Sequence, residues 1–125
     1  RAIFGVFLRW FNSQGQPLSG EVIVNQQIEG VQEHADLALM PDGSLVVVWA
    51  GASREDASGV YARRFSKTGQ PLGPQVLLHT SDAVRHDFPS VDVAQDGSIY
   101  VTWSRRTGGD SAWDILVRKL NAQLQ

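Results

Sequence analysis

Hydrophobic and polar positions alternate along this chain in short runs, the pattern of strands in antiparallel sheets. Two of these runs, 35–40 and 89–94, each end at an Asp-Gly pair, which predicts a hairpin turn with positive φ at both central positions. The returning runs, 44–49 and 98–103, are rich in β-branched and aromatic residues, so we expect both to be buried on two faces. No window has the apolar spacing of an amphipathic helix, and the chain is therefore expected to be all-β.

The same residue pattern recurs at an offset of 54 residues, which places Gly5 on Gly59. The identities in this ungapped register include Val6 with Val60, Arg9 with Arg63, Phe11 with Phe65, Asp42 with Asp96 and Trp49 with Trp103. A third copy at 114–120 fits after a one-residue insertion, which aligns Arg118 with Arg63. A period of roughly 50 residues is typical of propellers and related repeat arrays.

Each repeat unit contains four predicted strands joined by polar or glycine-rich turns. Four antiparallel strands per unit is the plan of a β-propeller blade, whose flat faces are buried only by neighbouring blades. The predicted fold is all-β and β-propeller-like, with about two four-stranded blades plus an extra strand. It closes through assembly or forms part of a longer array. We expect one repeat domain over 1–125, with units at about 5–58 and 59–113 and a partial third unit at 114–125.

The chain begins and ends on the same type of strand, the one seen in full at 60–65. If the first and last strands of the chain met to complete a blade, the chain would hold one more strand of this type than two four-stranded blades contain. Unpaired strand edges invite pairing with another chain, so we expect self-association or contact with neighbouring repeats of a longer chain. The residues predicted for this assembly edge are Val6, Phe7, Leu8, Ile115, Leu116 and Val117.

Composition narrows the functional classes. Hydrophobic residues make up 42% of the chain, charged residues 19%, and the net charge is −2, as in an ordinary globular protein. An acidic balance gives no general electrostatic reason to bind nucleic acid, and no apolar run is long enough for a membrane helix. The absence of cysteine excludes disulfides and thiolate metal sites. The sequence starts at Arg1 without Met and shows no basic and apolar targeting segment, so we expect a mature, processed or excised segment.

These motifs resemble repeats that occur in tandem in very large secreted or surface proteins of bacteria. The shared pattern is Val-Tyr-Ala-x-Arg-Phe, then Gly-x-Pro-x-Gly, a strand containing Val-Asn, and Asp-Gly-x-x-Val-Val-Trp. Its elements stand here at 60–65, 69–73, 24–25 and 42–49. The resemblance implies a propeller-like array at the bacterial cell surface or outside the cell, used in adhesion or as a scaffold. It supplies no catalytic residues. A similarity to sialidase-type propellers is weaker, because the spacing around the Asp-Gly turn differs.

Trp49 and Trp103 occupy the same repeat position at a strand end. One interpretation is a pair of carbohydrate-stacking platforms, one per blade, which would gain strength by avidity. The other, which we favour, is a core aromatic between blades, since both follow a β-branched run. Trp113 has no aromatic counterpart in the repeat and is the better candidate for an exposed ligand contact.

Arg63 recurs as Arg9 and Arg118 on the same strand face. Such a residue can grip an anionic sugar or carboxylate through two hydrogen bonds. The alternative, which we favour, is an arginine on an outer strand whose aliphatic chain packs over a neighbouring side chain and whose guanidinium pairs with nearby acidic residues.

The histidines give no metal prediction. The only local cluster of acids with histidine is His86 with Asp82 and Asp87, and nothing in its spacing makes the ligands converge. Asp42 and Asp96 are explained by hairpin turns. We therefore predict no metal, no cofactor and no catalytic residue.

Binding specificity would be expected in the least repeated loops, 51–58 and 105–113. The leading hypothesis is a non-catalytic surface module that acts as a scaffold or in adhesion. The alternatives are an oligomeric carbohydrate-binding lectin with sites between blades, at Trp49, Trp103, Trp113 and Arg63, and a fragment of a sialidase-like glycoside hydrolase propeller.

Overall fold

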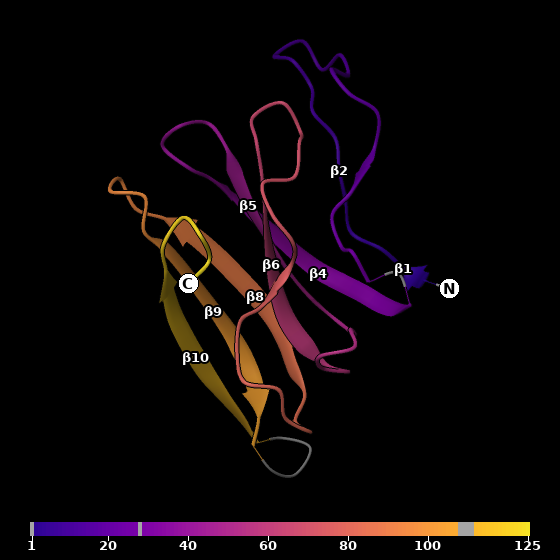
Figure 1. Ribbon diagram of the computed structural model, residues 1–125, viewed down its shortest axis with the longest axis vertical. Coiled ribbons are helices and arrows are strands. Elements are labelled where there is room, and N and C mark those ends of the chain that lie inside the picture. The colour runs from indigo at the N-terminus through magenta and orange to yellow at the C-terminus, as the bar shows by residue number, and fades with distance from the viewer. Residues whose placement is uncertain (1, 28, 108–111) are drawn as a thin grey trace.

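The computed structural model describes residues 2–27, 29–107 and 112–125 (Figure 1). Over these ranges the chain forms ten strands and no helix, so the all-β prediction is confirmed. No helix in the described part of the chain is long and apolar enough to cross a membrane.

The strands form three sheets, none of which closes on itself within the described ranges. The N-terminal sheet consists of β2 (Phe7–Leu8) and β3 (Val22–Ile23). The central sheet has the order β1-β4-β5-β6-β7, from β1 (Ala2–Phe4), β4 (Gly30–Leu39), β5 (Leu45–Gly51), β6 (Gly59–Phe65) and β7 (Val76–Leu77). The C-terminal sheet has the order β10-β9-β8, from β8 (His86–Val93), β9 (Ile99–Arg106) and β10 (Trp113–Leu120). Apart from β1, which pairs parallel with β4, the strand pairs are antiparallel.

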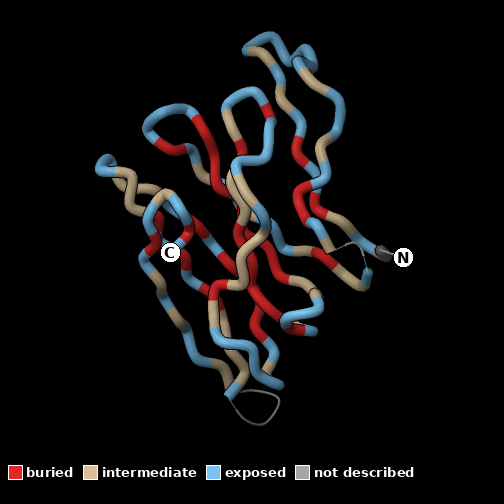
Figure 2. The backbone as a smooth tube through the Cα atoms, in the orientation of Figure 1, coloured by how far each residue is buried: buried red, intermediate tan, exposed pale blue. Residues whose placement is uncertain are grey.

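The central sheet lies between the other two (Figure 1), and buried positions gather in the middle of the molecule (Figure 2). One cluster of apolar side chains lies on each face of the central sheet. Side chains of β5 alternate between the clusters: Val47 and Trp49 face the N-terminal sheet, whereas Val46 and Val48 face the C-terminal sheet. Every residue from 44 to 50 is buried, which confirms the prediction for the run 44–49.

The matching prediction for 98–103 is wrong. Ile99, Val101 and Trp103 are buried against the central sheet, but Tyr100 and Thr102 on the opposite face of β9 are exposed. The reason is positional, because within the described residues no further sheet covers that face. The difference between β5 and β9 therefore reflects their place in the stack of sheets.

The Asp-Gly hairpins form, with a different turn from the one predicted. Gly43 has φ 85° and Gly97 has φ 86°, while the preceding aspartates do not have positive φ. Met40 N–H donates to the Ser44 carbonyl over 2.7 Å, so the loop contains three residues and ends in a left-handed glycine. The Asp42 carboxylate accepts a hydrogen bond from Ser44 N–H over 2.9 Å and holds the turn.

β4 and β8 begin earlier than the runs 35–40 and 89–94 predict. In each strand a β-bulge shifts the register, and it contains a non-glycine residue with positive φ: His34 at 54° and Phe88 at 56°. These two residues are equivalent in the repeat. A bulge interrupts the alternation of inward and outward side chains. The part of each strand before the bulge is therefore out of phase with the alternating apolar run after it, and the sequence pattern did not reveal it.

Candidate functional site

The two repeated tryptophans lie in the core. Trp49 is 0% exposed and Trp103 is 3% exposed. The indole N–H of Trp49 donates to Gln32 Oε1 over 3.2 Å, and that of Trp103 donates to His86 Nδ1 over 2.9 Å. Gln32 and His86 are equivalent in the repeat, so the same kind of buried hydrogen bond joins β4 to β5 in the central sheet and β8 to β9 in the C-terminal sheet. An indole buried this deeply has no face for a sugar, and the carbohydrate-stacking interpretation of Trp49 and Trp103 does not fit the structure.

Arg63 links two sheets. Its Nε–H donates to the Gly73 carbonyl over 2.9 Å, and its Nη1 donates to the Val24 carbonyl of the neighbouring sheet over 3.0 Å. Arg118 repeats this contact, donating from Nη1 to the Leu78 carbonyl over 2.7 Å. Burial lowers the pKa of Arg63 below its ordinary value. Because the guanidinium is committed to backbone carbonyls, the anion-gripping interpretation of Arg63 does not fit either.

Replacing Arg63 with methionine is expected to lower the free energy of unfolding by about 1–2 kcal/mol, since a partly buried charged hydrogen bond between sheets is lost. The matched control is Arg9→Met. Arg9 makes the equivalent bond within its own sheet, from Nε to the Ser19 carbonyl over 3.1 Å, and none to another sheet within the described residues. Urea unfolding of both variants in dilute solution measures the difference. Equal losses would show that the contact with Val24 adds no stability.

His86 is the most enclosed titratable side chain of the C-terminal sheet. Its Nε2 donates to Asp82 Oδ1 over 3.1 Å, which fixes Nδ1 as the acceptor for Trp103. The ring stacks on His79 with centroids 3.5 Å apart, and His79 Nε2 accepts the N–H of Val60 of the central sheet over 3.1 Å. The sequence singled out His86 with Asp82 and Asp87. Of these two aspartates, Asp82 forms a hydrogen bond with the His86 ring, whereas the Asp87 carboxylate accepts one from His34.

Burial and the neighbouring His79 lower the pKa of His86 below its ordinary value of 6.5. The unfolded chain therefore binds a proton more readily than the folded chain does, and stability must fall as the pH drops below 6.5. His86→Gln is the matched variant, because glutamine at position 32 already accepts the indole N–H in the same way. Urea unfolding between pH 8 and 5 is expected to lose less stability toward acid in the variant than in the parent. The same acid sensitivity in both chains would contradict the assignment.

One group of side chains has the ligand types of a metal site. Glu33, His34 and Asp87 each offer one ligand atom, and these atoms lie within 4.8 Å of one another. Asp87 is buried and already accepts hydrogen bonds from His34 Nδ1 over 2.8 Å and from Arg85 Nη2 over 2.6 Å. Burial raises the pKa of Asp87, but these two bonds and the Phe88 N–H outweigh it and hold the pKa below its ordinary value. The Asp87 carboxylate is thus already engaged by an ion pair with Arg85 and by hydrogen bonds from His34 and the Phe88 N–H.

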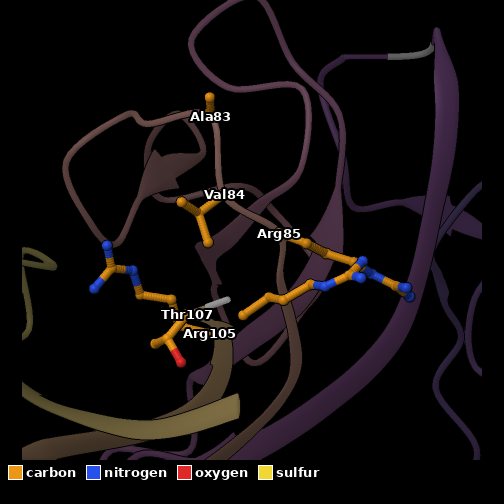
Figure 3. A pocket seen from close by; sticks show the side chains of 6 residues that line it. Ala83, Val84, Arg85, Arg105 and Thr107 are labelled. Atoms are coloured by element: carbon orange, nitrogen blue, oxygen red, sulfur yellow. The ribbon is translucent and has the colours of Figure 1, made fainter. Parts of the chain in front are cut away.

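A cavity of about 530 Å³ lies at one end of the C-terminal sheet (Figure 3). Its walls come from the segment before β8 and from the end of β9, namely Ala83, Val84, Arg85, Arg105, Arg106 and Thr107. The Arg85 guanidinium also lies over the ring of Trp113, 5.7 Å from its centroid, and Trp113 is half-buried. Three arginines therefore line the cavity, of which Arg85 is ion-paired with Asp87 and Arg105 with Asp82, and Trp113 lies against Arg85 outside the lining. Residues 108–111 of the predicted specificity loop lie outside the described residues.

The six residues predicted for the assembly edge fall into two groups. Val6, Leu8 and Leu116 point inward, the first two buried and the third half-buried. Phe7, Ile115 and Val117 are exposed on the outer faces of the first and last sheets. Both strands are edges of their sheets, since β2 pairs only with β3 and β10 only with β9 among the described strands.

Comparisons with protein-family models, curated proteins and known structures found no match to this chain. The resemblance to tandem bacterial surface repeats therefore stays a prediction.

Proposed function

We propose that this chain is a β-propeller-type repeat module that acts as a non-catalytic scaffold or adhesion element of a bacterial secreted or cell-surface protein. The observation that carries the proposal is the repeated contact between sheets. Arg63 bonds to the Val24 carbonyl at one junction, and Arg118 bonds to the Leu78 carbonyl at the next. Two junctions built from equivalent residues support a series of blades that can be extended by adding units.

The way the polar side chains are used also supports a scaffold. Gln32 and His86 hold the buried indoles, and the Tyr61 hydroxyl donates to the Asp56 carbonyl over 2.8 Å. Asp56 in turn accepts Ser58 N–H over 2.8 Å and orders the loop between β5 and β6. These groups satisfy one another inside the fold, the usual role of buried polar residues in a structural domain.

Two measurements test the proposal. An antibody against the purified module, applied to intact cells of the source bacterium, is expected to label their surface or the culture medium. Labelling only after lysis would contradict the location. The parent protein, screened against a panel of glycosides that includes sialosides, is expected to release no sugar. Turnover that survives repurification would overturn the non-catalytic role.

A second candidate function is the binding of an acidic carbohydrate. The observation that favours it is the arginine-lined cavity beside Trp113, because guanidinium groups pair with carboxylates and an indole face stacks on a sugar ring. Arg85 and Arg105 already pair with Asp87 and Asp82, so the sugar carboxylate has to compete with these two aspartates. Titration with a sialylated oligosaccharide is expected to change the tryptophan fluorescence of the parent and not that of Trp113→Leu. Saturable binding by both chains would move the site elsewhere, and no binding by the parent would end this alternative.

A further inference from the structure

We propose that a second copy of this chain packs head to tail against the first, with the outer face of β2–β3 of one copy on the outer face of β9–β10 of the other. We call these the front face and the back face. The inference rests on the proposed repeat scaffold and specifies how its units associate. It replaces edge-strand pairing with the packing of one sheet on another.

The front face is defined by Phe7, Phe11 and Ile23, which are all exposed. Phe7 is 55% exposed and Phe11 is 53% exposed, whereas their equivalents in the central sheet, Tyr61 and Phe65, are 1% and 0% exposed. Those equivalents are buried because the N-terminal sheet covers them. The exposed residues of the front face therefore occupy the repeat positions that, in the central sheet, are buried by the sheet before it.

The front face also has the arginine geometry of the junction. The guanidinium carbon of Arg9 lies 5.5 Å from the centroid of the Phe11 ring, and that of Arg63 lies 5.4 Å from the Phe65 ring. Arg63 has this arrangement with another sheet packed against it, and Arg9 has it without one. The face is thus preorganised for a partner, which limits the ordering that binding would require.

The back face is defined by Tyr100, Ile115 and Val117, also exposed. Ile115 is 74% exposed and Val117 is 68% exposed, and their equivalents Val60 and Ala62 are both 0% exposed. Val60 and Ala62 are buried in the layer that the central sheet shares with the C-terminal sheet. The back face therefore has the same repeat positions as the face of the central sheet against which the C-terminal sheet packs.

Inside the chain, the two kinds of face already meet. Val60 and Ala62 on the back of the central sheet share one apolar cluster with Val101, Trp103 and Leu120 on the front of the C-terminal sheet. A second copy would continue this established junction. Because the two faces differ, the contact is heterologous, and it forms rings or open chains according to the angle between copies.

The direction of the exposed side chains decides between face packing and edge pairing. Phe7, Ile115 and Val117 stand off the faces of their sheets, perpendicular to the direction in which a new strand would bond. Adding a strand at the edge of β10 would leave Ile115 and Val117 in water. Packing on the face removes them from water, which is favourable in proportion to the apolar area buried.

The experiment uses one variant per face, Phe11→Lys on the front and Ile115→Lys on the back. Sedimentation over a range of concentrations is expected to show association of the parent chain, while each variant alone remains monomeric. An equimolar mixture is expected to give a one-to-one dimer, since Phe11→Lys keeps an intact back face and Ile115→Lys an intact front face. Gln95→Lys, which adds the same charge at an exposed turn, should associate like the parent. Circular dichroism establishes that each variant is folded.

A parent chain that stays monomeric at the highest concentration would overturn the inference. So would a variant that dimerises by itself, because that result requires two identical faces to meet, or a mixture that remains monomeric. None of these outcomes affects the scaffold proposal, which is judged separately by surface labelling and by the glycoside screen.

Discussion

Replacing Trp49 with alanine is expected to lower the free energy of unfolding by about 3–5 kcal/mol. The indole is fully buried between the central and N-terminal sheets and stacks on Tyr61 with ring centroids 6.0 Å apart. Its loss leaves a cavity and also leaves Gln32 Oε1 without the N–H that it accepts in a buried position. Domains of this size are usually stable by about 5–15 kcal/mol, so the variant should lose a large part of its stability. Urea unfolding followed by far-ultraviolet circular dichroism measures the change.

The matched control is Trp113→Ala, which removes the same side chain from a half-buried position at the end of the C-terminal sheet. The centroids of the Trp113 and Phe88 rings are 6.3 Å apart, and the guanidinium carbon of Arg85 lies 5.7 Å from the Trp113 ring centroid. The Trp113 ring is not enclosed between two sheets. We expect a clearly smaller loss of stability. If both variants lost the same amount, Trp49 would not be the structural centre of the junction, and the division of the tryptophans into core and surface would be wrong.

The repeat made much of this architecture predictable. Identical residues at an offset of 54 mark positions with the same surroundings, so Arg9 and Arg63 were expected on the same strand of successive sheets. Arg63 lies in β6, whereas Arg9 directly follows the shorter strand β2. Each guanidinium nevertheless lies over the ring of the phenylalanine two residues further along. The strand sequence within each unit was predictable for the same reason. Repetition cannot tell which unit is covered by a neighbour, and for that reason β9 was wrongly expected to be buried on both faces.

The polar partners inside the junctions could not be predicted. The partner of Arg63 is the backbone carbonyl of Val24, and a carbonyl has no sequence signature. Gln32 and His86 perform the same role for the two indoles, but they differ in residue type and were not recognised as a pair. Only their offset of 54 residues, combined with the repeated tryptophan seventeen positions further along the chain, could have connected them.

The arginine-lined cavity depends on parts of the chain that do not repeat. Arg85 and Arg105 come from two segments that are brought together by the pairing of β8 with β9. The sequence placed specificity in a loop at 105–113. Its first two residues, Arg105 and Arg106, form the end of β9 instead, and they line the cavity together with Thr107. The contribution of Arg85 required the register of the hairpin, which the bulge at Phe88 shifts.

Replacing Gly51 with alanine is expected to lower the free energy of unfolding by about 3 kcal/mol, because the new methyl group overpacks a buried site and displaces a hydrogen-bonded side chain. A Cβ atom at Gly51 would stand 2.8 Å from Gln32 Cδ and 3.0 Å from the Val31 carbonyl oxygen. Gln32 cannot turn away freely, since its Nε2 donates to the carbonyls of Glu29 over 3.1 Å and Ala52 over 2.9 Å. Urea unfolding of the variant measures the loss.

Gly20→Ala is the control for the intrinsic effect of the added methyl group. A Cβ atom at Gly20 meets no atom within 4 Å, and its φ is not positive, so the change in stability should stay within about 0.5 kcal/mol. Indole fluorescence gives a second readout, because displacement of Gln32 removes the hydrogen bond to Trp49 and should shift the emission of the folded Gly51→Ala chain. If Gly51→Ala behaved like Gly20→Ala in both measurements, Gln32 would be free to move, and the buried hydrogen bond between β4 and β5 would not be rigid.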